Sequence, residues 1–112
     1  MAATSRTESA AFINLLEELP ITKAATTSRV VVNNDLLRVV LFSFDAGEQL
    51  TEHASPRAVV VQLLSGKMTF NVAGEDHLMV PGDVIYLAPN ERHALVAEEA
   101  CHLSLVMVDT EA

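Results

Sequence analysis

The stretch GEQLTEHASPRAVVVQLLSG, residues 47–66, decides the fold of this 112-residue chain. Its run of alanine, valine and leucine at residues 58–64 indicates a β-strand, and residues 50–53 indicate a shorter strand before it. Ser65 and Gly66 separate this run from the next strand-like segment. Because glycine adopts a positive φ at little cost, they predict a tight hairpin. The stretch therefore predicts a protein of short strands and tight turns.

The same pattern of short apolar runs and turn residues continues on both sides of this stretch. Valine-rich, leucine-rich and isoleucine-rich runs are broken every 8 to 12 residues by Gly, Pro, Asn or Asp, as in β-sandwiches and barrels. Val80-Pro-Gly-Asp83 predicts a type II turn, and Pro89-Asn90 predicts another turn. We expect an all-β fold with strands at residues 29–32, 36–44, 50–53, 58–64, 67–72, 76–80, 84–88, 93–96 and 102–108.

One short helix is expected near the N-terminus. Ser5 and Glu8 have the spacing of a capping box, and apolar residues then recur at helical intervals before Pro20. We expect its apolar side chains to cover the barrel or a partner surface; they are Phe12, Ile13, Leu15, Leu16 and Leu19.

Composition restricts the classes of function. The chain has the length of one domain, and its 50% hydrophobic residues can form a core. Its formal charge of −8 repels phosphate backbones and anionic lipids, so we expect neither nucleic acid nor a membrane as partner. The chain has a single cysteine, Cys101, and we find no signal peptide or membrane span in the sequence. We therefore expect a cytoplasmic protein.

Two groups of residues resemble the motifs of the cupin superfamily. Gly47, His53 after five residues, and Gly66 resemble the first motif. Gly74, the turn at residues 81–83, Pro89 and His93 are similar to the second motif. The resemblance implies a small single-domain cupin, a jelly-roll (double-stranded β-helix) barrel at residues 29–108. A helix and lead-in at residues 1–28 precede this barrel, and a tail at residues 109–112 follows it.

The chain departs from the cupin pattern at two ligand positions. Ser55 stands where the family has its second histidine, and Val59 stands where it has a glutamate. The resemblance implies that the remaining ligands, His53 and His93, face each other inside the barrel mouth. We expect any divalent transition metal there (Zn, Ni, Fe or Mn) to be held weakly, because two first-shell donors are missing.

Other polar residues are candidates for the same pocket. Glu52 has the right chemistry for a third ligand, but alternation along a strand turns it away from the face of His53. Gln62 lies in an apolar run and is a candidate for the pocket wall, although strand parity places it opposite Val59. Tyr86 is a further candidate for ligand binding. Ordinary strand and surface roles remain the alternative for all three residues.

The pattern supports three functions. The first is a cupin that binds a small molecule in its barrel, with His53 and His93 at the polar end. The second is a metal-dependent cupin enzyme, a dioxygenase, isomerase or lyase, acting on a small organic substrate. The third is a stability or assembly module without chemistry. We also expect a homodimer, because the valine-rich strands carry few charges to protect an exposed sheet edge.

Overall fold

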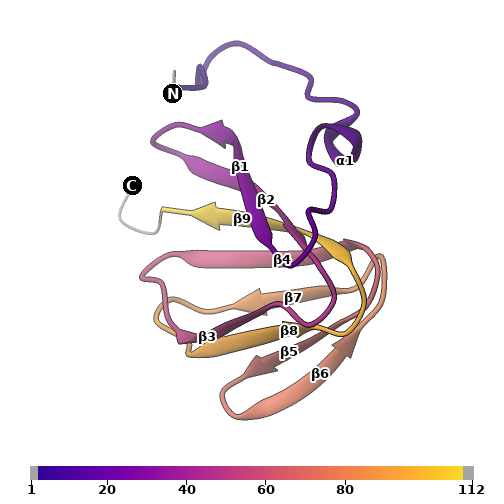
Figure 1. Ribbon diagram of the computed structural model, residues 1–112. Helices are drawn as coiled ribbons and strands as arrows, with labels where there is room; N and C mark the ends of the chain where they lie inside the picture. Colours follow the sequence, from indigo (N-terminus) through magenta and orange to yellow (C-terminus); the bar gives the residue numbers. More distant parts are fainter. Residues whose placement is uncertain (1–2, 110–112) are drawn as a thin grey trace.

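The computed structural model describes residues 3–109 as a β-sandwich of two antiparallel sheets (Figure 1). The first sheet has the order β1-β2-β9-β4-β7 and the second has the order β3-β8-β5-β6. The strands are β1 (Thr26–Asn33), β2 (Leu37–Phe44), β3 (Gln49–His53), β4 (Ala58–Ser65), β5 (Met68–Val72), β6 (Glu75–Met79), β7 (Val84–Leu87), β8 (His93–Ala97) and β9 (Cys101–Val108). The all-β jelly-roll prediction is confirmed, and each expected strand is found within a few residues of its predicted bounds.

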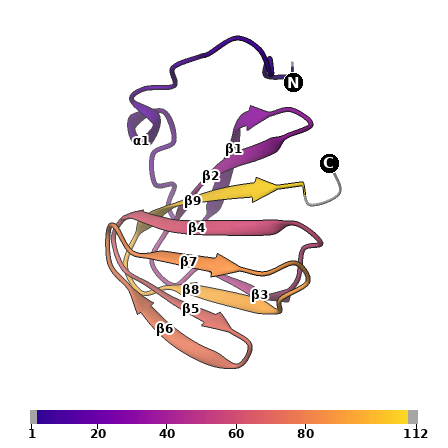
Figure 2. The ribbon, with the colours of Figure 1, turned by 180° about the vertical axis from the view of Figure 1, so that it is seen from behind.

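The two sheets curve around one core (Figure 2). Strand β4 illustrates the alternation: Val59, Val61 and Leu63 are buried between the sheets, whereas Val60 and Gln62 are exposed on the outside. The core continues across both sheets through large apolar side chains that are almost fully buried. These include Phe44, Met68, Phe70, Met79, Leu87 and Leu103. Among the described residues, no helix is long and apolar enough to cross a membrane.

The turn at Gly66 is not a hairpin, which corrects the sequence prediction. Strand β4 pairs with β7 and β9, whereas β5 pairs with β6 and β8, so the chain passes here from one sheet to the other. Gly66 has a φ of +79°, and a Cβ at this position would lie 2.1 Å from the carbonyl oxygen of Ala100. The glycine is required because this crossing packs directly against another backbone segment.

The other two predicted turns are confirmed. Asp83 donates its backbone N–H to the carbonyl of Val80 over 3.0 Å, and Gly82 has a φ of +97°. The N–H of Glu91 likewise bonds the carbonyl of Ala88 over 3.1 Å, next to Asn90 with a φ of +68°.

The N-terminal helix is much shorter than the apolar spacing predicts. Ser5 Oγ accepts the backbone N–H of Glu8, as in a cap, but no helix follows. The only helix among the described residues is α1 (Leu15–Glu18), preceded by Asn14 in the left-handed region. Phe12, Ile13 and Leu16 are exposed, and only Leu15 and Leu19 are half-buried, so the full apolar packing that the sequence predicts does not form. Without such packing, a short helix in water is marginal.

Polar contacts attach this segment to the first sheet instead. His102 Nε2 donates to the carbonyl of Leu19 over 2.7 Å, and Ser43 Oγ donates to the carbonyl of Pro20 over 3.4 Å. Ser43 and His102 are cross-strand partners on β2 and β9, and both are buried. We call this pair of side chains the Ser43–His102 clasp. It holds two consecutive carbonyls of the N-terminal segment on the outer face of the sheet.

Candidate functional site

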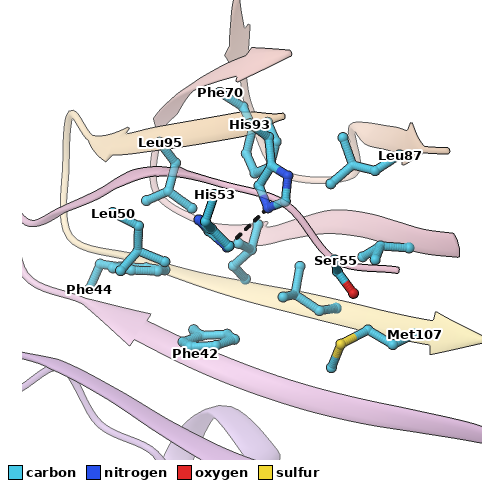
Figure 3. Close-up of a pocket in the computed structure, with 13 residues that line it drawn as sticks. Phe42, Phe44, Leu50, His53, Ser55, Phe70, Leu87, His93, Leu95 and Met107 are labelled. Carbon is cyan, nitrogen blue, oxygen red and sulfur yellow. Dashed lines mark hydrogen bonds between the residues drawn. The ribbon is translucent and has the colours of Figure 1, made fainter. Parts of the chain in front are cut away.

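A cavity of about 70 Å³ lies between the two sheets (Figure 3). Its walls are apolar except for His53, Ser55 and His93. The remaining lining residues are Phe42, Phe44, Leu50, Val59, Phe70, Leu87, Leu95, Leu103, Leu105 and Met107. Strands β2, β4, β7 and β9 supply one wall, and β3, β5 and β8 supply the wall that carries the two histidines.

His53 and His93 are brought together by the pairing of β3 with β8. They are cross-strand partners, and the register between these strands shifts between Leu50 and His53. This bulge turns both Leu50 and His53 toward the cavity although they are three residues apart. The two Nε2 atoms face each other at 3.1 Å (Figure 3).

The other ring nitrogen of each histidine contacts the backbone carbonyl two residues earlier in the chain. His53 Nδ1 lies 3.0 Å from the carbonyl oxygen of Thr51, and His93 Nδ1 lies 3.0 Å from the carbonyl oxygen of Glu91. A carbonyl oxygen only accepts hydrogen bonds, so each Nδ1 carries a proton. A neutral imidazole has one proton, and both Nε2 atoms therefore present lone pairs to each other. When both rings are neutral, no hydrogen bond joins the two Nε2 atoms, and a shared proton or a bound cation is needed to bridge them.

The two rings differ in their environment. His93 is only 7% exposed and stacks on Phe70 with ring centroids 5.8 Å apart, whereas His53 is exposed at the mouth. Burial lowers the pKa of His93 below its ordinary value, because the imidazolium ion loses its hydration. The bond to the Glu91 carbonyl partly opposes this change, and a positive charge on His53 adds to it. Burial therefore favours the neutral form of His93.

The donor set fits a metal ion only in part. A histidine whose Nδ1 is bonded to a carbonyl and whose Nε2 is free is a common metal ligand. Ser55 and Val59, at the two positions where the cupin pattern has further ligands, also line this cavity. Neither replaces a histidine or carboxylate, and the described residues contain no group of three His, Cys, Asp or Glu side chains that could hold a metal. Two imidazoles fit an ion whose remaining ligands come from solvent or a bound molecule.

Three candidates from the sequence lie outside the cavity. Glu52 points away from it and forms an ion pair with Arg92 over 3.0 Å. Gln62 and Tyr86 lie on the outer face of the first sheet, and Tyr86 is 62% exposed. Their expected place in the pocket wall is corrected, because strand parity directs Val59, Val61 and Leu87 inward instead.

Several residues that line the cavity were not predicted from the sequence. Phe42, Phe70 and Met107 line the cavity, and alternation with their strand neighbours is the signal that could have placed them there. The carbonyls of Thr51 and Glu91 carried no such signal, because any residue type supplies a backbone carbonyl.

Comparison with known proteins agrees with this architecture. A family model, the cupin domain, matches residues 40–109. A conserved protein of unknown function from Streptococcus pyogenes is 31% identical, with a TM-score of 0.85, and the match covers 100% of this chain and 98% of that one. A cupin superfamily protein from Desulfitobacterium hafniense is 18% identical, with a TM-score of 0.82 over 96% of this chain and 98% of that one. No curated protein matches the sequence.

A variant of salicylate 1,2-dioxygenase from Pseudoaminobacter salicylatoxidans also shares the fold. It is 21% identical, with a TM-score of 0.71, and the match covers 82% of this chain but only 29% of that enzyme. The fold and the facing histidines thus define a small jelly-roll protein with a cavity inside its barrel. The chain belongs to the cupin family.

Proposed function

We propose that this cupin binds a small, largely apolar organic molecule in its barrel cavity, with His53 and His93 at the polar end. The observation that carries the proposal is the cavity itself, an apolar space of about 70 Å³ with two convergent imidazole nitrogens. Ligand sites combine apolar walls with a few placed polar groups in this way. The occupant is small, because this volume is about half that of an apolar cavity of about 150 Å³ that is known to bind one benzene molecule.

The same two histidines would hold a divalent transition metal. Their Nε2 lone pairs converge, and their Nδ1 protons are bound to the Thr51 and Glu91 carbonyls, so no proton has to move for an ion to bind. Such an ion supplies Lewis-acid polarisation of an oxygen on a bound molecule. A site without a carboxylate favours Zn, Ni or Cu over Mn or Mg, and it binds them more weakly than a complete cupin site.

A metal-dependent enzyme is the second candidate function. The observation that favours it is the preset orientation of both imidazoles, which a purely apolar binding pocket would not need. The two candidates differ in the strength of metal binding, because a resident catalytic ion requires a tight site.

Calorimetric titration of metal-stripped protein with Zn and Ni tests the proposal. We expect one equivalent to bind with a Kd in the micromolar range or weaker, and His53→Ala and His93→Ala to abolish this binding. His77→Ala, which changes an exposed histidine on β6, is the matched control and should leave the affinity unchanged. Sub-micromolar affinity that both site variants abolish would favour the enzyme. Affinity that survives both variants would mean that the metal binds elsewhere.

A further inference from the structure

A second hollow, which we call the outer groove, lies on the outer face of the second sheet. It has a volume of about 260 Å³ and crosses strands β3, β8, β5 and β6. Ala94 and Val96 on β8 lie in its middle. Leu50 and Leu95 line both the outer groove and the barrel cavity, in which Figure 3 shows them. The two hollows therefore lie on opposite sides of this sheet.

Polar side chains from three strands surround the middle of the outer groove. They share the outer face because side chains alternate along each strand. The register of the sheet places Asn71 beside both Ala94 and Asp76. The polar side chains that line the groove are Gln49 and Thr51 on β3, Thr69 and Asn71 on β5, and Asp76 on β6.

Hydrogen bonds within the sheet hold three of these side chains in place. Asn71 Nδ2 donates to Asp76 Oδ1 over 2.9 Å, and Asn71 Oδ1 accepts the backbone N–H of Gly74 over 3.2 Å. Thr69 Oγ1 donates to Glu98 Oε1 over 2.9 Å. These contacts orient the polar groups before a ligand binds, which lowers the entropy cost of binding.

The outer groove offers both donors and acceptors to a ligand. The second carboxylate oxygen of Asp76 and the hydroxyl oxygen of Thr69 remain acceptors, and the second Nδ2 proton of Asn71 remains a donor. The Gln49 amide and the Thr51 hydroxyl can each donate and accept. A hydroxyl group fits this mixture, because it also donates and accepts.

The charges at the outer groove select against other ligand groups. Asp76 lines the groove and Glu98 is bonded to Thr69, whereas no lysine or arginine of residues 3–109 lines it. An anionic ligand is repelled by both carboxylates. An ammonium group is attracted to them, but it only donates hydrogen bonds and leaves the donors of Asn71 and Gln49 without an acceptor.

The size of the outer groove fits a substituted ring. An apolar cavity of about 150 Å³ binds one benzene molecule, so about 260 Å³ has room for a six-membered ring that carries hydroxyl groups. The aliphatic side chains of Ala94 and Val96 are half-buried in the middle of the groove. The C–H groups of such a ring gain by burial against them.

From these contacts we infer that the outer groove is a second binding site, for a small neutral polyhydroxyl ring with the chemistry of a monosaccharide. Its hydroxyl groups bind Asp76, Asn71 and Thr51, and its C–H face packs on Ala94 and Val96. This site is independent of the ligand and of the metal proposed for the barrel cavity.

A matched set of sugars tests the inference. The probes are the methyl pyranosides of glucose, galactose and mannose, with the uronate and the 2-amino sugar of each as the anionic and cationic relatives. Methyl chemical shifts of Thr51, Ala94 and Val96 report binding in the outer groove. Those of Leu103 and Leu105, which line only the barrel cavity, report binding there.

We expect at least one neutral pyranoside to shift the groove methyl groups with a Kd in the millimolar range, and its uronate to bind about tenfold more weakly or not at all. Asp76→Ala should weaken binding about fivefold or more, because it removes a charged acceptor. Asp76 is exposed, so this change does not threaten the fold. Glu75→Ala, the control, removes the same charge from the neighbouring residue, which does not line the groove, and should leave the affinity unchanged.

The contrary outcomes are distinct from a failure of the proposed function. Absence of groove shifts with all three neutral sugars, or shifts confined to Leu103 and Leu105, would overturn the second site. Equal binding of the uronate, or binding of the amino sugar alone, would overturn the neutral class of ligand. Equal effects of Asp76→Ala and Glu75→Ala would also overturn the inference. None of these results bears on the metal titration of His53 and His93.

Discussion

Gly66 shows how a single residue is fixed by a close approach of two backbone segments. Its φ is +79°, and an added Cβ would meet the Ala100 carbonyl oxygen and the Cys101 side chain at less than 3 Å. Gly47 also has a positive φ, +87°, but nothing lies within 4 Å of the place of its missing Cβ. An added Cβ would therefore cause only backbone strain at Gly47, but both backbone strain and a steric clash at Gly66.

We expect Gly66→Ala to lower the free energy of unfolding by about 2–5 kcal/mol, the sum of left-handed strain and overpacking. Gly47→Ala, the matched control, should cost only the strain, about 1–2 kcal/mol. Urea denaturation measures both values. Equal costs for the two variants would show that the strand crossing at residue 66 relaxes easily.

His93 gives the stability of the metal-free protein a defined pH dependence. Because burial lowers its pKa, the folded protein binds fewer protons at this ring than the unfolded chain, where the pKa is the ordinary value of about 6.5. The stabilisation from the neutral ring is complete above that value and is lost as the pH falls from it toward the lower folded-state pKa.

We therefore expect the urea midpoint to fall between pH 7.5 and pH 5.5, and to fall less in His93→Gln. The exposed His77→Gln serves as the control and should retain the wild-type change. If His93→Gln kept the whole pH dependence, other groups would account for it.

At the scale of elements, the N-terminal segment depends on polar contacts rather than on an apolar helix face. The Ser43–His102 clasp binds the carbonyls of Leu19 and Pro20, and the side chains of both clasp residues are buried beneath the segment. Ser65 Oγ completes the polar cluster through a 2.8 Å hydrogen bond to Nδ1 of His102. Removing the segment would break these bonds and expose the face of β2 and β9 to water.

We expect deletion of residues 1–20 to lower the melting temperature by at least about 5 °C, since each lost hydrogen bond costs about 1 kcal/mol and a domain of this size loses several degrees per kcal/mol. Deletion of residues 1–10 leaves the clasp intact and should have a smaller effect. Calorimetry measures both. An unchanged melt after the longer deletion would show that the clasp contributes nothing to stability.

At the scale of the whole molecule, one outer surface remains apolar. Strand β7 is an edge of the first sheet, and its outward side chains Val84 and Tyr86 are 56% and 62% exposed. Their partners on β4 are Gln62 for Val84 and Val60 for Tyr86. Edge strands with apolar side chains and no charges favour pairing with another chain. The surface on β4 and β7 is thus where we expect a second copy to bind.

We predict a homodimer in solution, with twice the 12.1 kDa mass by light scattering at micromolar concentration. Val84→Lys and Tyr86→Lys should shift the equilibrium toward the monomer, because each places a charge on this surface. Leu78→Lys, on the exposed face of the other sheet, is the control and should leave the dimer intact. A monomer for the unmodified protein would contradict the prediction.

The sequence by itself determined the nine strands of residues 3–109 and the turns at residues 80–83 and 88–91. These features depend on local alternation and on the φ preferences of proline, glycine and asparagine. It also predicted that His53 and His93 belong to one site, because their motif spacing resembles that of cupins.

Only the tertiary structure decided which sheet each strand joins, and therefore that residue 66 is a crossing and not a hairpin. It also placed Gln62 and Tyr86 outside the cavity and left the apolar N-terminal residues largely without helical structure. The orientation of the two imidazoles likewise depends on the β3 bulge and on two backbone carbonyls. Strand pairing, burial and backbone hydrogen bonds join residues far apart in the chain, and local residue preferences carry no information about such partners.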